Sequence, residues 1–442
     1  MANIFNFLNN VFLEIKQENR TNRSFVYVIL LLLTIPLSLA INNICLGLLF
    51  IATVVYFKKY NFKLDYNLFL PISLYLLMVV SVFWSIDIEN TKTALLKELP
   101  ILIIPVCFLF FQELTKETKQ IIIKYYSYGI VLFSFFYLLK AIIRFYFSQN
   151  LDVFFYHELV TKEVNAIHVS VYVAIAFFYF FIKPIKSTFD YVAIVILFLM
   201  AFLLSSKNII VVFIGLMIVY QLFYAKSAKK LRLKNLIVFT VLLCSFAFIG
   251  KIKDRFRQEY ETIMTDSTVN DVISKDIGTI YNVSIKQAWT NNTFQPNDYF
   301  PGTAFRVYQF RIFLEMLQED SIFWKGYGLN ASYPKIAAKG VYYNVFLGTN
   351  EQQGYQTKNF HNQYVQNFAE LGVFGFLILM IMLIINLRNG INNKNFLHIA
   401  FAILMISLFL TETFLWRQRG VVFFTTMYCL FNSRTYKNKI IE

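Results

Sequence analysis

A histidine and an asparagine stand side by side, as His361 and Asn362, at the end of a long polar segment. An apolar run long enough to enter a membrane begins immediately after them. An imidazole at the boundary between water and membrane is placed to exchange a proton with a group carried at the membrane surface. This pair is therefore the first candidate for chemistry in the chain.

The composition is that of a membrane protein. Hydrophobic residues make up 57% of the chain and aromatic residues 19%, only 15% are charged, and the mean hydropathy is +0.54. Soluble domains carry roughly a quarter charged residues. The 4 cysteines lie inside apolar runs without the spacing or neighbouring histidines of a zinc site. We therefore expect them to be buried apolar side chains.

The apolar segments predict an all-α polytopic membrane protein with about twelve transmembrane helices. They lie at about 25–40, 44–57, 67–83, 94–111, 121–147, 167–182, 190–204, 208–224, 236–250, 363–387, 396–411 and 420–432. The stretch 25–57 is nearly continuous, and Asn42-Asn43 is its indicated turn. The expected organisation is a membrane part over 1–250 with about nine spans, an extramembrane segment over 251–362, and a second membrane part over 363–442 with about three spans.

The positive charge predicts the orientation. The formal net charge is +15, and alternating spans with a cytoplasmic N-terminus place nearly all of this excess on cytoplasmic segments. The densest basic segment, Lys226 to Lys234, then lies inside. Both termini are expected in the cytoplasm. Because the charge is explained by topology, we expect no nucleic-acid partner.

Residues 251–362 form the one long polar stretch, and alternation places it outside. It holds 12 basic and 11 acidic residues, so it is not a polybasic tail. Apolar residues recur at helical spacing from Ala304 to Leu317. A loop of this length without structure would be unusual. We expect a partly helical cap over the membrane helices.

Several short motifs lie around the histidine in a fixed order. The cap run carries Arg306 and Arg311, and then come Gly326-Tyr-Gly328, His361-Asn362 and Glu370-Leu-Gly372. Upstream lie Ser81-Val-Phe-Trp-Ser85 and Leu203-Leu-Ser-Ser-Lys207. This order resembles the O-antigen ligase and O-antigen polymerase family, most specifically over 300–375. Lys207 stands where the family has an arginine, so the charge is kept but the bidentate fork is lost.

The resemblance implies a glycosyltransferase of the bacterial inner membrane with its active site facing the periplasm. Its expected partners are a glycan donor on undecaprenyl pyrophosphate, a lipid A-core or glycan acceptor, and membrane lipids. His361 would be the catalytic base with Asn362 beside it. Arg306, Arg311 and Lys207 would bind the pyrophosphate, and His168, Gly326 and Gly328 would complete the substrate site. No Asp-x-Asp pair occurs in the expected outer loops, so we expect no metal and no cofactor, with transfer that inverts the anomeric carbon.

Each of these residues also has a simpler interpretation. His361 would then be an ordinary interfacial histidine and His168 a packed one. The two arginines would lie on a solvated helix face, Lys207 would snorkel from a helix end, and the glycines would mark a turn. Glu412 with Arg417 and Arg419 is interpreted as a charge cluster at a helix end rather than a catalytic set.

Three classes of function compete. The first is glycan transfer, either by a ligase that acts on lipid A-core or by a polymerase that joins glycan to glycan; a ligase that glycosylates proteins is a further branch. The second is a lipid-linked glycan flippase or transporter, for which broken spans and inverted repeats would be typical. The third is a scaffold protein, which has no need of a histidine and arginines gathered at one face.

The orientation is testable with reporter tags. Tags after residue 60, near residue 230 and at the C-terminus should report the cytoplasm, because the basic segments lie there. A tag near residue 290 should report the outside. A cytoplasmic signal at 290 would contradict both the topology and the expected active site.

Overall fold

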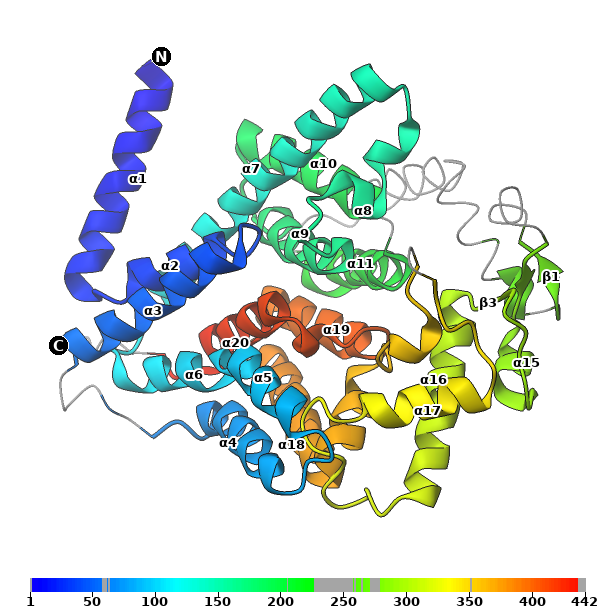
Figure 1. Cartoon of the computed structure of the whole chain (residues 1–442). Helices are drawn as coiled ribbons and strands as arrows, with labels where there is room; N and C mark the ends of the chain where they lie inside the picture. Colours follow the sequence, from blue (N-terminus) through cyan, green and yellow to red (C-terminus); the bar gives the residue numbers. More distant parts are fainter. Residues whose placement is uncertain are drawn as a thin grey trace.

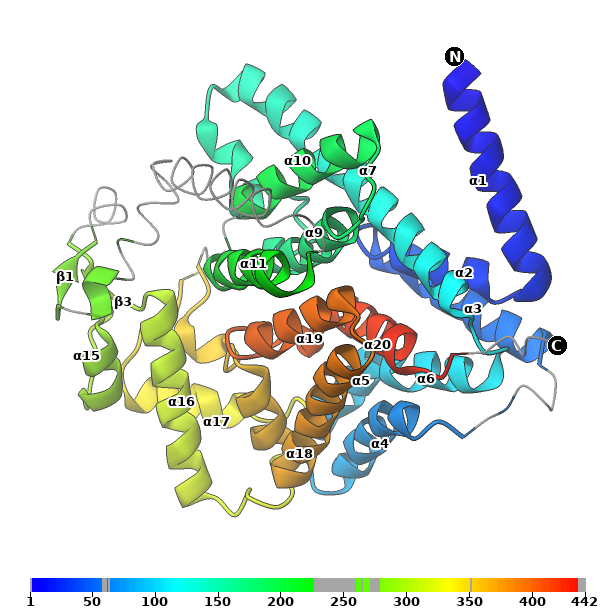
Figure 2. The ribbon, with the colours of Figure 1, turned by 180° about the vertical axis from the view of Figure 1, so that it is seen from behind.

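The computed structural model describes residues 2–57, 62, 64–204, 206–225, 257, 260–263, 265–270, 279–349 and 352–435. The described chain is mostly α-helical, with three short strands. Figure 1 shows both termini at one end of the molecule and the helices of the predicted cap at the other, and the reverse view in Figure 2 agrees.

The helices before the cap correspond to most of the predicted apolar segments. They are α1 (Ala2–Thr21), α2 (Phe25–Leu33), α3 (Leu39–Val55), α4 (Tyr66–Val80), α5 (Ile88–Glu98), α6 (Pro100–Phe110), α7 (Lys116–Ser148), α8 (Tyr156–Leu159), α9 (Ala166–Phe181), α10 (Thr188–Leu203) and α11 (Lys207–Val219). The three after the cap are α18 (Gln363–Asn392), α19 (Phe396–Phe409) and α20 (Gln418–Asn432). The predicted segment 236–250 lies outside the described residues.

Among the described residues, 5 helical stretches are long and apolar enough to cross a membrane. They are Tyr66–Phe83, Ile88–Phe110, Lys116–Ser148, Lys207–Tyr224 and Gln363–Asn392. Helices α3, α9, α10 and α19 are apolar but shorter. The protein is therefore a mostly helical membrane protein, as predicted in outline.

The turn predicted at Asn42-Asn43 is wrong, because both residues lie inside α3. The chain leaves its helical path between α2 and α3, around Pro36. Proline has no N–H to continue a helix, and it disfavours a helical residue before it. The Asn42 side chain instead donates hydrogen bonds of 2.9 Å to the carbonyl of Leu31 and to Oγ1 of Thr34, so it satisfies groups at the end of α2.

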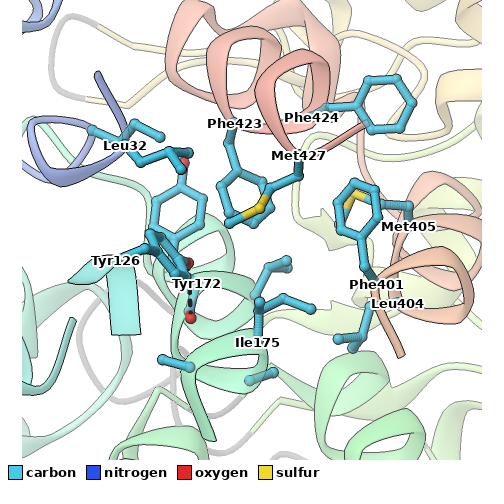
Figure 3. Packing of buried hydrophobic residues seen from close by; sticks show 14 of the residues in the cluster. Leu32, Tyr126, Tyr172, Ile175, Phe401, Leu404, Met405, Phe423, Phe424 and Met427 are labelled. Atoms are coloured by element: carbon cyan, nitrogen blue, oxygen red, sulfur yellow. Dashed lines mark hydrogen bonds between the residues drawn. The ribbon is translucent and has the colours of Figure 1, made fainter. Parts of the chain in front are cut away.

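The core of the membrane part is built on helices buried around their whole circumference. Nearly every residue of α9 and α20 is buried. In Figure 3, Tyr126, Tyr172 and Ile175 converge with Phe401, Phe423 and Met427 on one packed centre. The hydroxyl of Tyr126 donates to the Tyr172 carbonyl at 3.0 Å, so this buried polar group has a partner. Burial around its whole circumference makes α9 an internal helix of the membrane part.

The cap has a hydrophobic core of its own. The cap comprises α15 (Ile285–Thr290), α16 (Gly302–Glu319), α17 (Tyr333–Tyr342) and a small sheet. The predicted run Ala304–Leu317 lies within α16, so this helix is confirmed. In the sheet, β1 (Thr268–Val269) pairs antiparallel with β2 (Tyr281–Asn282), and β2 pairs parallel with β3 (Asp298–Tyr299).

Helix α18 contributes to both hydrophobic cores. Val365 and Ala369 pack in the cap cluster, whereas Leu371, next to the break, and Leu379, Met382 and Leu383, beyond it, pack in the membrane cluster. The helix is interrupted at Gly372, which has φ 66° and ψ −165°. Helix α18 therefore joins the two parts of the molecule.

The break in α18 is matched by the turn Gly326-Tyr327-Gly328. The carbonyls of Ala369 and Glu370 accept hydrogen bonds of 2.9 Å from the N–H groups of Tyr327 and Gly328. The N–H of Val373, which an unbroken helix would direct at Ala369, donates to the carbonyl of Phe323 at 2.8 Å. These three hydrogen bonds form the cap joint, and they keep buried backbone groups paired across the break.

Replacing Gly372 with alanine should weaken the cap joint. The conformation at Gly372 is left-handed, and an added Cβ would fall 2.3 Å from the backbone of Trp324. Strain of this kind costs about 1–3 kcal/mol before the clash is counted. We expect Gly372→Ala to lower the melting temperature of the purified protein by several degrees.

Gly215→Ala in α11 is the matched control, because nothing lies within 4 Å of its added Cβ. This change should leave the melting temperature equal or higher, since alanine favours a helix interior over glycine by about 1 kcal/mol. Equal melting temperatures for the two variants would contradict the role assigned to Gly372.

Candidate active site

His361 lies where the polar cap chain turns into α18. Its backbone is left-handed, with φ 48°, which is uncommon for a residue with a side chain. Its N–H donates to Oδ1 of Asn359 at 3.1 Å, so the turn is held by a local side chain. The imidazole is about one-third exposed and packs edge-on to Phe305 of the cap, with ring centres 5.5 Å apart.

Asn362 is the N-cap of α18. Its Oδ1 accepts hydrogen bonds from the N–H groups of Tyr364 at 3.0 Å and Val365 at 3.1 Å. The first N–H groups of a helix have no intrahelical acceptor, so this side chain satisfies two of them. The structure thus gives Asn362 a part in fixing the backbone beside His361.

Arg306 extends from α16 to the loop that follows α19. Its Nε donates to the carbonyl of Thr411 at 2.8 Å, and one Nη donates to the carbonyl of Gly302 at 2.8 Å. The other Nη lies 3.4 Å from Oε1 of Glu412. A guanidinium has five N–H groups, so these contacts leave two for a ligand. Arg306 is thus a cation fixed at the boundary between the cap and the membrane helices.

Glu412 connects the two predicted site residues. Its other oxygen, Oε2, lies 3.7 Å from Nδ1 of His361, a distance too long for a hydrogen bond but suited to an ion pair when the imidazole is protonated. The cluster predicted from Glu412, Arg417 and Arg419 is therefore corrected. The buried Arg419 pairs with the loop before α9, at 3.6 Å from Glu163.

Glu412 was not predicted as a site residue, because its partners His361 and Arg306 lie far from it in the sequence. Fifty residues, which include α18 and α19, lie between His361 and Glu412, and these two helices pack against each other. The available signal was a carboxylate just after one apolar segment and a histidine just before the preceding one.

Lys207 lies on the same side of the membrane part. It is the first residue of α11. Its neighbour Asn208 donates to the carbonyl of Ser407 at 2.7 Å and to Oγ1 of Thr411 at 2.9 Å. Because Arg306 binds the carbonyl of the same Thr411, the start of α11 is tied to the end of α19 where Arg306 docks.

Lys358 is a second cation that the sequence analysis did not single out. It lies three positions before His361, and its Nζ is 5.7 Å from the ring centre of Phe305 and 4.8 Å from that of Tyr355. Burial lowers the pKa of this lysine. An ammonium held against aromatic rings and partly removed from water gains from an approaching anion.

Arg311 is built into the cap instead. Its Nε lies 3.1 Å from Glu315, one Nη donates to the Asn291 carbonyl at 2.7 Å, and its guanidinium stacks 4.6 Å above the ring of Tyr343. Burial opposes ionisation of Glu315, but hydrogen bonds from Tyr343 and Lys339 outweigh it and lower the pKa of this carboxyl. Arg311 thus belongs to a charged network that holds α16 against α17 and the preceding loop.

His168 and the two glycines lie apart from the His361 cluster. His168, on α9, is buried, and its ring centre is 4.2 Å from that of Phe414. Gly326 and Gly328 both have positive φ, and a Cβ would fall 2.3 Å from the backbone of Glu370 and 2.6 Å from Ser85, respectively. The structure gives the glycines a packing role in the cap joint.

The remaining motifs also meet at this joint. The indole N–H of Trp84 donates to the carbonyl of Lys325 at 2.8 Å. Glu370 is buried, and its carboxylate accepts hydrogen bonds from Gln366 and, at 3.3 Å, from Ser332. Elements far apart in the sequence therefore fix the orientation of the first half of α18, and with it the position of His361.

The resulting cluster combines a base with cations at a membrane boundary. His361 offers an imidazole, Glu412 a carboxylate beside it, and Arg306 a guanidinium with N–H groups available to an anion. Within the described ranges, no three histidine, cysteine, aspartate or glutamate side chains gather as a metal site would require. Such a cluster is suited to proton transfer beside a phosphate-bearing ligand.

Comparison with known proteins finds a similarity to a family over part of the chain. Residues 192–380 match the family model described as O-Antigen ligase. The match spans the end of the first membrane part, the cap, the His361-Asn362 pair and most of α18. It confirms the resemblance that the motifs indicated. No curated protein matches the chain.

Proposed function

We propose that this protein of the O-antigen ligase family transfers a glycan from undecaprenyl pyrophosphate to a sugar hydroxyl of lipid A-core. The family implies glycan transfer by a membrane protein, and the donor, acceptor and mechanism are our proposal. One observation carries it: Glu412 lies between His361 and Arg306 at the outer end of the membrane helices. A proton acceptor and an anion-binding group are thereby held side by side.

Arg306 binds the pyrophosphate of the donor. Its contacts to the Thr411 and Gly302 carbonyls fix the plane of the guanidinium, so its remaining N–H groups have a set direction. A fixed fork matches phosphate oxygens in a bidentate manner. Lys207 and Lys358 add positive charge on neighbouring elements. Together these cations stabilise the charge that develops on the leaving pyrophosphate.

His361 accepts the proton of the acceptor hydroxyl. The hydroxyl oxygen attacks the anomeric carbon, a new glycosidic bond forms, and the bond from that carbon to the pyrophosphate oxygen breaks. Undecaprenyl pyrophosphate leaves with the bonding electrons, and displacement from the opposite face inverts the anomeric carbon. Glu412 is a positioning residue, whose carboxylate lies 3.7 Å from Nδ1 of the imidazole.

The proposal places no metal in this step, because cationic side chains take the part of a divalent ion at the pyrophosphate. The active site faces the periplasm from the inner membrane, where the donor glycan and lipid A-core meet. A polymerase of the same family would use the same donor and a glycan acceptor. An assay that offers purified protein each acceptor in turn distinguishes the two reactions.

His361→Ala should abolish transfer while the protein still inserts into the membrane. The side chain is partly exposed and contributes little to the cap core, whereas losing a general base costs about 10²–10⁴-fold in rate. His157→Ala is the control, since His157 is the exposed histidine of α8. Turnover by purified protein is the measurement.

Near-normal turnover by folded His361→Ala would remove His361 from the mechanism. Equal loss in His361→Ala and His157→Ala would indicate a general effect of the substitutions and not the loss of a base.

The turnover of Arg306→Lys should fall well below that of wild type, because lysine keeps the charge but cannot bind the pyrophosphate in a bidentate manner. The turnover of Arg306→Ala should fall further. Its affinity for lipid pyrophosphate should fall as well. Arg311→Ala should chiefly lower the melting temperature, because Arg311 is bonded within the cap. A chelator should change turnover little.

Normal lipid-pyrophosphate binding by Arg306→Ala would show that Arg306 does not bind the pyrophosphate. Loss of activity on chelation would show instead that a metal ion is required.

A further inference from the structure

An apolar groove runs along the outer surface of α18 and α19. It has a volume of about 340 Å³. Its lining residues are Tyr364, Met380, Leu383, Ile384, Leu387, Arg388, Ile391, Asn392 and Ile406. From Met380 to Ile391 they follow helical spacing, so they form one stripe on the membrane half of α18. The volume lies at the lower end of the range for small-ligand sites.

The groove has a packed floor and an open side. Leu383 is almost fully buried at 1% exposure and forms part of the membrane core. Ile384 and Ile391 are 57% and 52% exposed, so one wall faces the surroundings of the helix. Apolar side chains at this depth of a membrane helix face lipid. A groove of this shape admits an apolar chain from the side.

One end of the groove adjoins the candidate active site. Tyr364 follows His361 by three positions, and its hydroxyl donates to the carbonyl of Ile406 at 2.9 Å. Ile406 precedes Thr411, the acceptor of the Arg306 hydrogen bond, by about one and a half helical turns. The groove therefore begins within a few residues of the Arg306 cluster and runs along α18 toward Arg388.

We propose that this groove binds the first isoprene units of the donor's polyprenyl chain. The inference rests on the proposed function, which sets the pyrophosphate at Arg306. From there the chain must enter the bilayer, and the groove is a continuous apolar surface that starts at that point. An acyl chain of a phospholipid whose head group lies at Arg388 is the competing occupant. It would use only the far end, whereas the groove extends to Tyr364.

The experiment fills the groove and varies the length of the donor chain. Leu387→Trp places an indole at a half-buried lining position. Ile381→Trp is the matched control, because Ile381 lies on the same helix, is 43% exposed and does not line the groove. Each protein is assayed with a donor carrying the full polyprenyl chain and with a donor carrying a single isoprene unit, chosen to end near Tyr364 before it reaches Leu387.

We expect Leu387→Trp to raise the KM for the long-chain donor about tenfold, equivalent to losing roughly two buried CH₂ groups. Its KM for the short-chain donor and all constants of Ile381→Trp should stay near those of wild type. An unchanged KM for the long-chain donor, or equal losses with both donors, would overturn the inference. So would loss of co-purified phospholipid with both KM values unchanged.

A binding measurement separates this inference from the proposed function. Polyprenyl pyrophosphate with a diazirine near its pyrophosphate end should label the lining residues of wild type, and Leu387→Trp should reduce that labelling relative to Ile381→Trp. If the groove is labelled but the protein fails to transfer glycan, the groove does bind the polyprenyl chain and the proposed transfer reaction is wrong. Labelling spread evenly over other helices would reject the groove.

Discussion

The positions of His361 and Arg306 relative to each other depend on the hydrogen-bonded joint between the Gly326-Tyr327-Gly328 turn and the break in α18 at Gly372. At this joint two helix carbonyls accept from the turn, and a helix N–H donates back to the chain just before it. These hydrogen bonds let one helix contribute to both hydrophobic cores across its break without leaving buried backbone groups unpaired. It also explains the glycines, because a Cβ at Gly326 or Gly372 would overlap the opposite backbone.

The joint sets the cap against one end of the membrane helices, and that contact creates the charge cluster. Arg306 comes from the cap, Glu412 from the loop after α19, and His361 from the chain that enters α18. Neither part of the molecule holds the set alone. The cluster would therefore respond to any change that lifts the cap, even one far from His361. A glycine in the joint and a histidine in the cluster are thus linked through the rigid first half of α18.

The sequence predicted much of the fold because its signals were local. The apolar segments, helix α16 and the start of α18 just after His361-Asn362 follow from composition and helical spacing. The break between α2 and α3 was placed at Asn42-Asn43, although Pro36 was the stronger signal. Asn42 looked like a turn residue because asparagine is common in turns, whereas its side chain binds Leu31 and Thr34 at the end of α2 from within α3.

Site prediction stopped where chemistry depended on tertiary contacts. The motifs identified His361 and Arg306, but nothing near them in sequence pointed to Glu412, which reaches them only when α18 and α19 pack together. The different roles of Arg306 and Arg311 also depend on tertiary contacts. The two are five positions apart on one helix and so face different neighbours. Arg311 meets Glu315 and Tyr343 within the cap, whereas Arg306 meets the membrane part.

The left-handed backbone at His361 follows from these constraints taken together. The chain must leave the cap core at the buried Phe360 and begin α18 at Gln363. A residue with φ near 48° reverses the chain in a single step, at a cost of about 1–3 kcal/mol. Asn359 and Asn362 offset that cost by accepting hydrogen bonds from the N–H groups of His361 and Tyr364, respectively. The backbone of His361 is therefore held in one conformation, and in the proposed mechanism a base that is already positioned loses little entropy when its substrate arrives.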